Sequence, residues 1–224
     1  MGLSGRDHDE EIERRVIERM SDISSELAHD LRSPLQTIRN AVYLIERNPD
    51  NPVYYRMIKE SLDQATEMLD DFRDYYKGHI IRKVESDLGK VYEMSKSSVE
   101  IPDNIRLIEE IEDTDEIKID PGAIMKVFMK LLKNAVEAQP EGGVIRVRIE
   151  DGDDHVVTSI SDEGPGVSKQ VQEVLFTPFE SHKKRGKGLG LPAAKRIVES
   201  HGGSMSYETV EGEGTTFSFV LPKD

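Results

Sequence analysis

The chain has 224 residues, enough for one large domain or two modest ones, and its 30 Lys and Arg against 44 Asp and Glu give a formal net charge of −14. This charge disfavours nucleic acid as a partner, and the lack of Cys excludes disulfides, thiolate metal sites and cysteine catalysis. The polar, acidic N-terminus and the lack of an apolar run of about 18 residues argue against a signal peptide or a membrane span, so we expect a cytoplasmic chain that reaches a membrane only through a sensor segment not present in it.

The first predicted element is a long amphipathic helix from about residue 10 to Arg47. Its apolar stripe, with steps of three or four residues, consists of Ile12, Val16, Met20, Ile23, Leu27, Leu31, Leu35, Ile38, Val42 and Ile45. Two prolines within 48–52 end this helix, and a second amphipathic helix runs from about Tyr54 to Gly78. The sequence therefore predicts a helical hairpin over residues 1–78. Two helices bury little alone, so we expect it to dimerise into a four-helix bundle, with packing on the rest of its own chain as the alternative.

His29 lies off this apolar stripe. At about 100° per residue it is roughly 200° around the helix from both Leu27 and Leu31, so its imidazole should point to solvent beside the carboxylate of Asp30. An isolated histidine is more often a buried structural residue, but the periodicity argues against that role here. A neighbouring acid can orient an exposed imidazole, so the pair suits a nucleophile or a general base.

After Gly78 the pattern changes to mixed α/β and predicts a second domain over residues 79–224. The predicted strands are 80–84, 106–111, 116–119, 144–150, 155–161, 207–210 and 215–221, the last four forming two hairpins. The predicted helices are 86–96, the core helix from Pro121 through Ala135, and 192–200. A mixed sheet with helices on one face fits this order of elements.

Two polar groups in this half have no evident structural role. Asn134 follows Lys130 by four residues on the predicted core helix, where an amide does not favour the helix and a ligand role is attractive. Asp162 directly follows a strand, and Gly164 and Gly166 after it would let a ligand approach the backbone. A solvated Asn and a plain turn remain open as alternatives.

Two further segments follow in the sequence. The first, 176–185, is apolar and then basic, and the second, 186–191, is rich in glycine. The glycine-rich segment opens the helix predicted at Pro192, so its N–H groups and the positive end of the helix dipole could face phosphates. A glycine-rich loop by itself is a weak signal.

The string from His29 to Leu35, HDLRSPL, resembles the phosphoacceptor box of sensor histidine kinases. The four groups above, in this order and spacing, resemble the Asn, first glycine, Phe and second glycine boxes of the ATP-binding domain that these kinases share with gyrase, mismatch-repair and heat-shock ATPases. The segment 212–215 resembles the third glycine box. The resemblance implies an α+β chain, in which a dimeric four-helix bundle bearing His29 precedes a Bergerat-type (GHKL) α/β sandwich.

The resemblance also implies a reaction and its residues. The γ-phosphoryl group of ATP would pass to His29, with Asp30 holding or accepting the ring proton, and then to an aspartate on the receiver domain of a response regulator. Asn134 would hold Mg²⁺ against the phosphates, and Asp162 would accept from the adenine amino group. The other nucleotide-binding residues implied are Gly164, Gly166, Phe179, Lys183, Gly186, Lys187, Gly188, Leu189, Gly190 and Thr215.

Three positions depart from the family pattern. Lys130 stands where histidine kinases often have a second Asn, and Glu137 stands where many have Lys or His. We therefore expect Lys130 to help neutralise the phosphates, together with Lys183, Lys184, Arg185 and Lys187. Ser33 stands where Thr or Asn supports dephosphorylation of the partner in many relatives, so we expect at most a weak phosphatase activity.

Two other classes of function remain as alternatives. A related ATP hydrolase would need a carboxylate to activate water, and Lys130 occupies the place where the ATPase relatives have that Glu. A nucleotide-binding scaffold that signals without chemistry would give no reason for an exposed His29–Asp30 pair. Both alternatives are therefore disfavoured.

Overall fold

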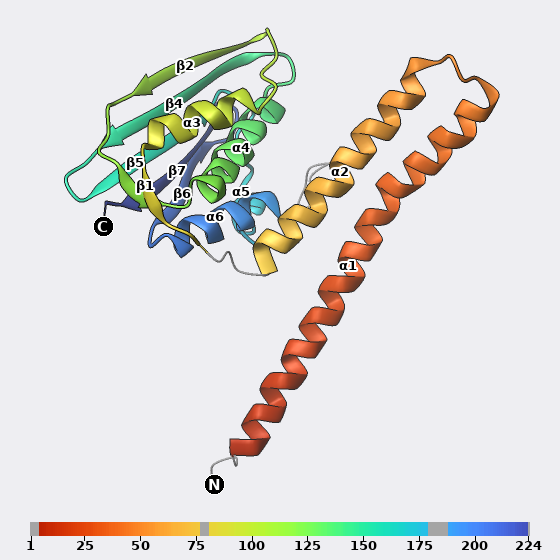
Figure 1. Cartoon of the computed structure of the whole chain (residues 1–224), viewed down its shortest axis with the longest axis horizontal. Coiled ribbons are helices and arrows are strands. Elements are labelled where there is room, and N and C mark those ends of the chain that lie inside the picture. Colours follow the sequence, from red (N-terminus) through yellow and green to blue (C-terminus); the bar gives the residue numbers. More distant parts are fainter. Residues whose placement is uncertain (1–4, 77–80, 179–187, 224) are drawn as a thin grey trace. The chain divides into compact units, whose positions relative to one another are not determined.

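The structure, a computed structural model, describes residues 5–76, 81–178 and 188–223 (Figure 1). Its internal contacts divide the chain into two compact units, one that ends at Asp70 and one that begins at Asp71. Among the described residues, none of the helices combines the length and the apolar character that a membrane crossing requires.

The first unit is the predicted helical hairpin, made of α1 (Gly5–Arg47) and most of α2 (Pro52–Tyr76) (Figure 1). Asn51 immediately precedes α2 and caps its first turn, because its side-chain Oδ1 accepts the backbone N–H of Val53 at 3.0 Å. Ala41 and Met68 are buried in this unit. The first helix begins a little earlier than the sequence predicts, at Gly5.

The second unit contains a five-stranded sheet with the order β2-β4-β5-β7-β6. The strands are β2 (Ile105–Ile111), β4 (Gly143–Asp151), β5 (His155–Asp162), β6 (Ser204–Val210) and β7 (Gly214–Pro222). Strand β2 pairs with β4 in parallel, and the other neighbours are antiparallel. The predicted mixed sheet and both predicted hairpins are therefore confirmed.

A separate two-stranded sheet joins β1 (Val84–Ser86) to β3 (Ile117–Ile119). The prediction of a strand at 80–84 was wrong, because the strand begins only at Val84. Two residues earlier, the backbone N–H of Arg82 donates to the carboxylate of Asp120 at 3.1 Å instead of joining a strand ladder.

Four helices accompany the sheet: α3 (Leu88–Ser97), α4 (Pro121–Ala138), the short α5 (Lys169–Gln172) and α6 (Gly190–Ser200) (Figure 1). Aspartates cap two of them, since Asp87 accepts from the N–H of Lys90 at 3.1 Å and Asp120 accepts from the N–H of Ala123 at 3.0 Å. The helix α5 was not predicted. These caps explain why α3 and α4 begin where they do.

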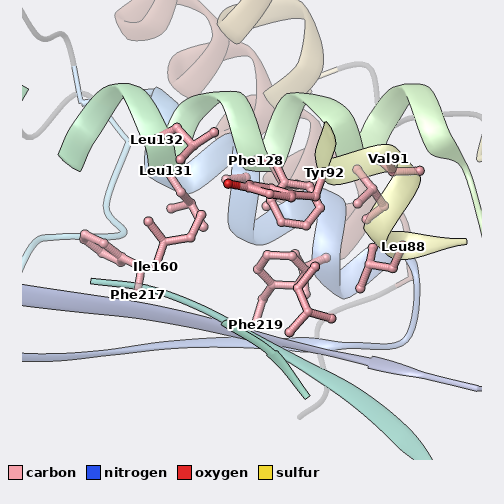
Figure 2. Close-up of a cluster of buried hydrophobic side chains, with 14 of the residues drawn as sticks. Leu88, Val91, Tyr92, Phe128, Leu131, Leu132, Ile160, Phe217 and Phe219 are labelled. Carbon is pink, nitrogen blue, oxygen red and sulfur yellow. The ribbon is translucent and has the colours of Figure 1, made fainter. Parts of the chain in front are cut away.

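The core lies between α3, α4 and α6 and one face of the sheet (Figure 2). The ring of Phe128 on α4 lies 5.5 Å from that of Tyr92 on α3 and 5.3 Å from that of Phe219 on β7, in tilted and edge-on geometries. The predicted inward side chains of α4 are all buried: Ile124, Val127, Phe128, Leu131, Leu132 and Ala135. The helix that carries Asn134 is thus fixed in place by these buried side chains.

His201 connects the end of α6 to the start of α4 and is 1% exposed. Its Nε2 accepts the backbone N–H of Asp120 at 2.9 Å, so that nitrogen carries no proton, and Nδ1 donates to the carbonyl of Ile197 at 2.8 Å. Burial raises the pKa of the Asp120 carboxyl, but the lowering interactions, led by the hydrogen bonds from the N–H groups of Arg82 and Ala123, outweigh it in sum, and the pKa lies below its ordinary value. This histidine is therefore a neutral structural residue.

Candidate active site

His29 lies on α1 with its side chain 77% exposed, as its position off the apolar stripe predicts. Its Nδ1 lies 3.2 Å from Oδ1 of Asp30, whose side chain is 17% exposed. Because a carboxylate only accepts, this contact is a hydrogen bond when the ring proton is on Nδ1. That tautomer leaves Nε2 with a lone pair, as a nucleophile requires.

Ser33 follows His29 by one helical turn and is also exposed. Its carbonyl accepts the hydroxyl of Thr37 at 3.2 Å, and the next residue, Pro34, is buried. The hydroxyl of Ser33 is thus on the same side of α1 as the imidazole and accessible to solvent.

Asn134 is half-buried at the edge of the core face of α4, since it follows the buried Val127 by seven residues, or about two helical turns. Lys130, one turn earlier, forms an ion pair with Asp71 near the end of α2, within the second unit. The expected proximity of Lys130 to Asn134 follows from the helix itself. The ion pair with Asp71 was not predicted.

Two glycines after β5 lie so close to other parts of the chain that a side chain at either position would not fit. A Cβ on Gly164 would lie 2.9 Å from the Cβ of Ala138, and Gly166 has a φ of +67°, with a Cβ that would lie 2.3 Å from the carbonyl oxygen of Val210. Both positions therefore require glycine. The loop after β5 is therefore held close to Ala138 at the end of α4 and to Val210 at the end of β6.

Asp162, at the end of β5, is only 8% exposed. Its Oδ1 accepts the N–H of Gly164 at 2.9 Å, which fixes the orientation of the carboxylate. Thr215 on β7 is paired opposite Asp162 and is 5% exposed, and its hydroxyl lies 3.0 Å from that of Thr209. A carboxylate held in this way can accept from the amino group of a base, so these residues fit an adenine nucleotide.

Gln139, which the sequence analysis did not single out, connects α4 to this loop. Its side chain is 4% exposed, and its Oε1 accepts the backbone N–H groups of Val144 at 3.1 Å and Glu163 at 3.2 Å. Its Nε2 donates to the carbonyl of Ala135 at 3.3 Å. No motif signals this role, because the three partners lie on separate segments.

The start of α6 has the backbone that the glycine-rich segment predicts. Gly188 has a φ of +68°, and Leu189 occupies the N-cap position, where an aliphatic side chain offers no acceptor to the first-turn N–H groups. Such a terminus suits an anionic ligand. The other expected nucleotide-binding residues Phe179, Lys183, Gly186 and Lys187 lie outside the described residues.

Two family models match the chain. The model of the histidine kinase-, DNA gyrase B- and HSP90-like ATPases matches residues 119–224, and the model of the His Kinase A (phospho-acceptor) domain matches residues 19–79. The first range contains Asn134 and the glycine segments, and the second contains His29. The chain belongs to the sensor histidine kinases and holds their phosphoacceptor and ATP-binding domains.

Individual relatives agree with this family. Sporulation kinase E of Bacillus subtilis (strain 168) is 30% identical over 210 residues, which are 91% of this chain and 28% of that kinase. The sensory histidine kinase/phosphatase NtrB of Salmonella typhimurium (strain LT2) is 30% identical over 218 residues, which are 90% of this chain and 62% of that protein. The chain thus spans less than two thirds of the length of either curated relative.

A solved structure agrees as well. The histidine kinase ThkA in complex with the response regulator protein TrrA matches 100% of this chain and 68% of that one, with a TM-score of 0.73 and 26% identity. The predicted succession of a helical hairpin and a GHKL-type α/β domain is therefore confirmed.

Proposed function

We propose that this chain transfers the γ-phosphoryl group of ATP to His29 and passes it on to an aspartate on the receiver domain of a response regulator. The observation that carries this proposal is the exposed imidazole of His29, with its Nδ1 beside Asp30, in a chain that also holds a domain of the ATP-binding family. A scaffold without chemistry does not need such a pair. The complex of ThkA with TrrA supports the partner class.

The chemistry at His29 follows from the tautomer. The lone pair of Nε2 forms the new N–P bond while the bond from the γ-phosphorus to the bridging oxygen breaks, and ADP leaves with that electron pair. The ring gains positive charge, and Asp30 either stabilises the Nδ1–H or takes its proton. The attack of the receiver's aspartate on phosphorus then returns the electron pair to Nε2.

The nucleotide is assigned to the second unit. Asp162 would accept from the adenine amino group, Gly164 and Gly166 would shape the base pocket, and Thr215 would support Asp162 from β7. Phe179, Lys183, Gly186, Lys187, Gly188, Leu189 and Gly190 would enclose the base and the triphosphate. Mg²⁺, when bound, would neutralise phosphate charge, and the amide oxygen of Asn134 would be its protein ligand.

We also propose that two copies of the hairpin pair into a four-helix bundle. Leu35 and Val42 on α1 are 57% and 45% exposed, and Leu62 and Leu69 on α2 are 51% and 49% exposed. Each pair is seven residues apart, the repeat that aligns side chains along one seam of a helix bundle. These exposed apolar side chains favour burial against a second copy.

We also propose that the phosphoacceptor domain ends at Gly78, that the ATP-binding domain follows it, and that the protein acts in the cytoplasm.

The proposal is tested by incubating the protein with γ-labelled ATP and Mg²⁺. We expect a label on the protein that is lost in acid and stable in base, absent from His29→Gln, and transferable to a receiver domain. His155→Gln, which removes another exposed imidazole, is the matched control and should be labelled normally. Undiminished labelling of His29→Gln would disprove the role of His29, and release of free phosphate without a labelled protein would favour the hydrolase.

A further inference from the structure

Asp71 places a carboxylate against a cation beside the proposed nucleotide site. Its Oδ1 forms an ion pair with Nζ of Lys130, and its Oδ2 would lie 3.8 Å from a Cβ on Gly190, the first residue of α6. The side chains of Lys130 and Asp71 are only 11% and 13% exposed, so solvent screens this pair weakly.

Lys130 is well placed to bind phosphate. It lies one helical turn before Asn134, the proposed Mg²⁺ ligand, and its partner Asp71 lies next to Gly190 at the start of α6, whose first-turn N–H groups suit an anion. A carboxylate that already holds Lys130 would have to give up that cation before a phosphate group could pair with it.

We propose that Asp71 competes with the nucleotide phosphates for Lys130 and so lowers the affinity for nucleotide. This proposal rests on the function proposed above. The apparent dissociation constant of a ligand equals its intrinsic value divided by the fraction of protein in the competent state. If the Asp71–Lys130 pair were closed about nine tenths of the time, nucleotide affinity would be lowered about tenfold. The competition acts on phosphate groups alone, because Lys130 is not needed for recognition of the base.

A second ion pair on the same two helices provides a matched control. Asp74, three residues after Asp71, pairs with Lys126 at 2.6 Å, and Lys126 lies one turn before Lys130, farther from Asn134. The Asp74 side chain is 4% exposed, so this pair, like the Asp71–Lys130 pair, stabilises the contact between the end of α2 and α4. Loss of the Asp74 charge would loosen the same helix contact without releasing Lys130.

The test compares nucleotide affinities of the whole chain by calorimetry, with ADP, a non-hydrolysable ATP analogue and adenosine as probes. Asp71→Asn should bind both nucleotides about tenfold more tightly than the unchanged protein and adenosine with equal affinity. Asp74→Asn should bind all three as the unchanged protein does. Thermal unfolding without ligand verifies that each variant is folded, and Asp71→Ser replaces Asp71→Asn if the latter is not.

Lys130→Gln completes a double-mutant cycle. It should weaken nucleotide binding, and Asp71→Asn should have no further effect in its background. Unchanged or weaker nucleotide binding by Asp71→Asn, an equal gain for adenosine, or an equal gain in Asp74→Asn would each overturn the competition. If the unchanged protein bound neither nucleotide, the proposed function itself would fail.

Discussion

The side-chain oxygen of Gln139 accepts the backbone N–H of Glu163 at 3.2 Å, and so joins the end of the helix that carries Asn134 to the loop that follows Asp162. The same oxygen accepts the N–H of Val144 at the start of β4. One buried amide thus sets the position of the proposed metal-binding helix relative to the proposed base pocket.

Replacement of Gln139 by Met should therefore weaken both folding and nucleotide binding. Two part-buried N–H groups would lose their acceptor, and because water can reach such groups in part, we expect a loss of about 1–3 kcal/mol of unfolding free energy in total. ADP affinity should fall several-fold, because the Glu163 loop is no longer held. Thermal unfolding and calorimetric titration measure the two effects. Asn104→Ala, which removes an exposed amide that donates to the carbonyl of Pro140 at 3.4 Å, should change neither the unfolding free energy nor the ADP affinity. If Gln139→Met bound ADP as tightly as the unchanged protein, Gln139 would have no positioning role.

Acid should weaken the second unit through the helix cap at Asp120. The pKa of Asp120 lies below its ordinary value of 3.8, so the stability it contributes is fully present above about pH 4 and is lost as pH falls through the pKa of the folded state. Asp120→Ala should cost about 1 kcal/mol of unfolding free energy at pH 7 and progressively less below pH 4. Denaturant unfolding across pH measures this, with Asp153→Ala in an exposed turn as the control. A difference that stays constant down to pH 2 would contradict the assignment.

Much of the fold could be predicted, because strong local signals determine its elements. Apolar side chains at helical spacing identified α1, α2 and α4, and successive strand patterns identified both antiparallel hairpins. Two elements escaped for physical reasons. The strand at 80–84 was misplaced because the backbone N–H of Arg82 donates to Asp120, the N-cap of α4, a contact between segments far apart in the sequence. The helix α5 has four residues, too few for a periodic signal.

The candidate site divides in the same way. The exposure of His29 was predicted from the local sequence and is observed, and Gly166 has a φ of +67°, which its lack of a side chain permits. Gln139 and Asp71 could not be found, since their importance comes from partners on other elements. Sequence periodicity indicates which face of a helix a residue occupies, but not which distant side chain meets it there.

Loss of the amide oxygen of Asn134 should remove most autophosphorylation. Asn134→Ala would leave Mg²⁺ without its proposed protein ligand, and we expect labelling to fall about a hundredfold or more. Asn134→Asp keeps an oxygen ligand, so it should regain activity as Mg²⁺ is raised, whereas Asn134→Ala should not. Initial rates of labelling over a range of Mg²⁺ concentrations measure this. Normal rates in Asn134→Ala would exclude Asn134 from the site.

A charge on the exposed apolar seam of the hairpin should break the proposed dimer. Leu62→Arg would place a guanidinium where a second copy is expected to bury a leucine, and burial of an unpaired charge is strongly unfavourable. Light scattering should then give the mass of a monomer. Val210→Arg, at a valine that is 55% exposed in the second unit, should leave the dimer intact. A monomeric unchanged protein would disprove the proposed bundle.

The proposed reverse activity depends on Ser33. Attack of water on the receiver's phosphoaspartate requires a polar group near His29 to align that water, and Ser33 lies one helical turn away on the same face, with its side chain exposed. Serine lacks the methyl group that stiffens threonine at χ1, so it should align water loosely.

We therefore expect weak phosphatase activity that rises a few-fold in Ser33→Thr, with autophosphorylation little changed. Decay of phosphorylated receiver in the presence of ADP measures this, and Ser25→Thr, an exposed serine one turn before His29, is the matched control. Equal decay with Ser33→Thr and the unchanged protein would refute the role given to Ser33.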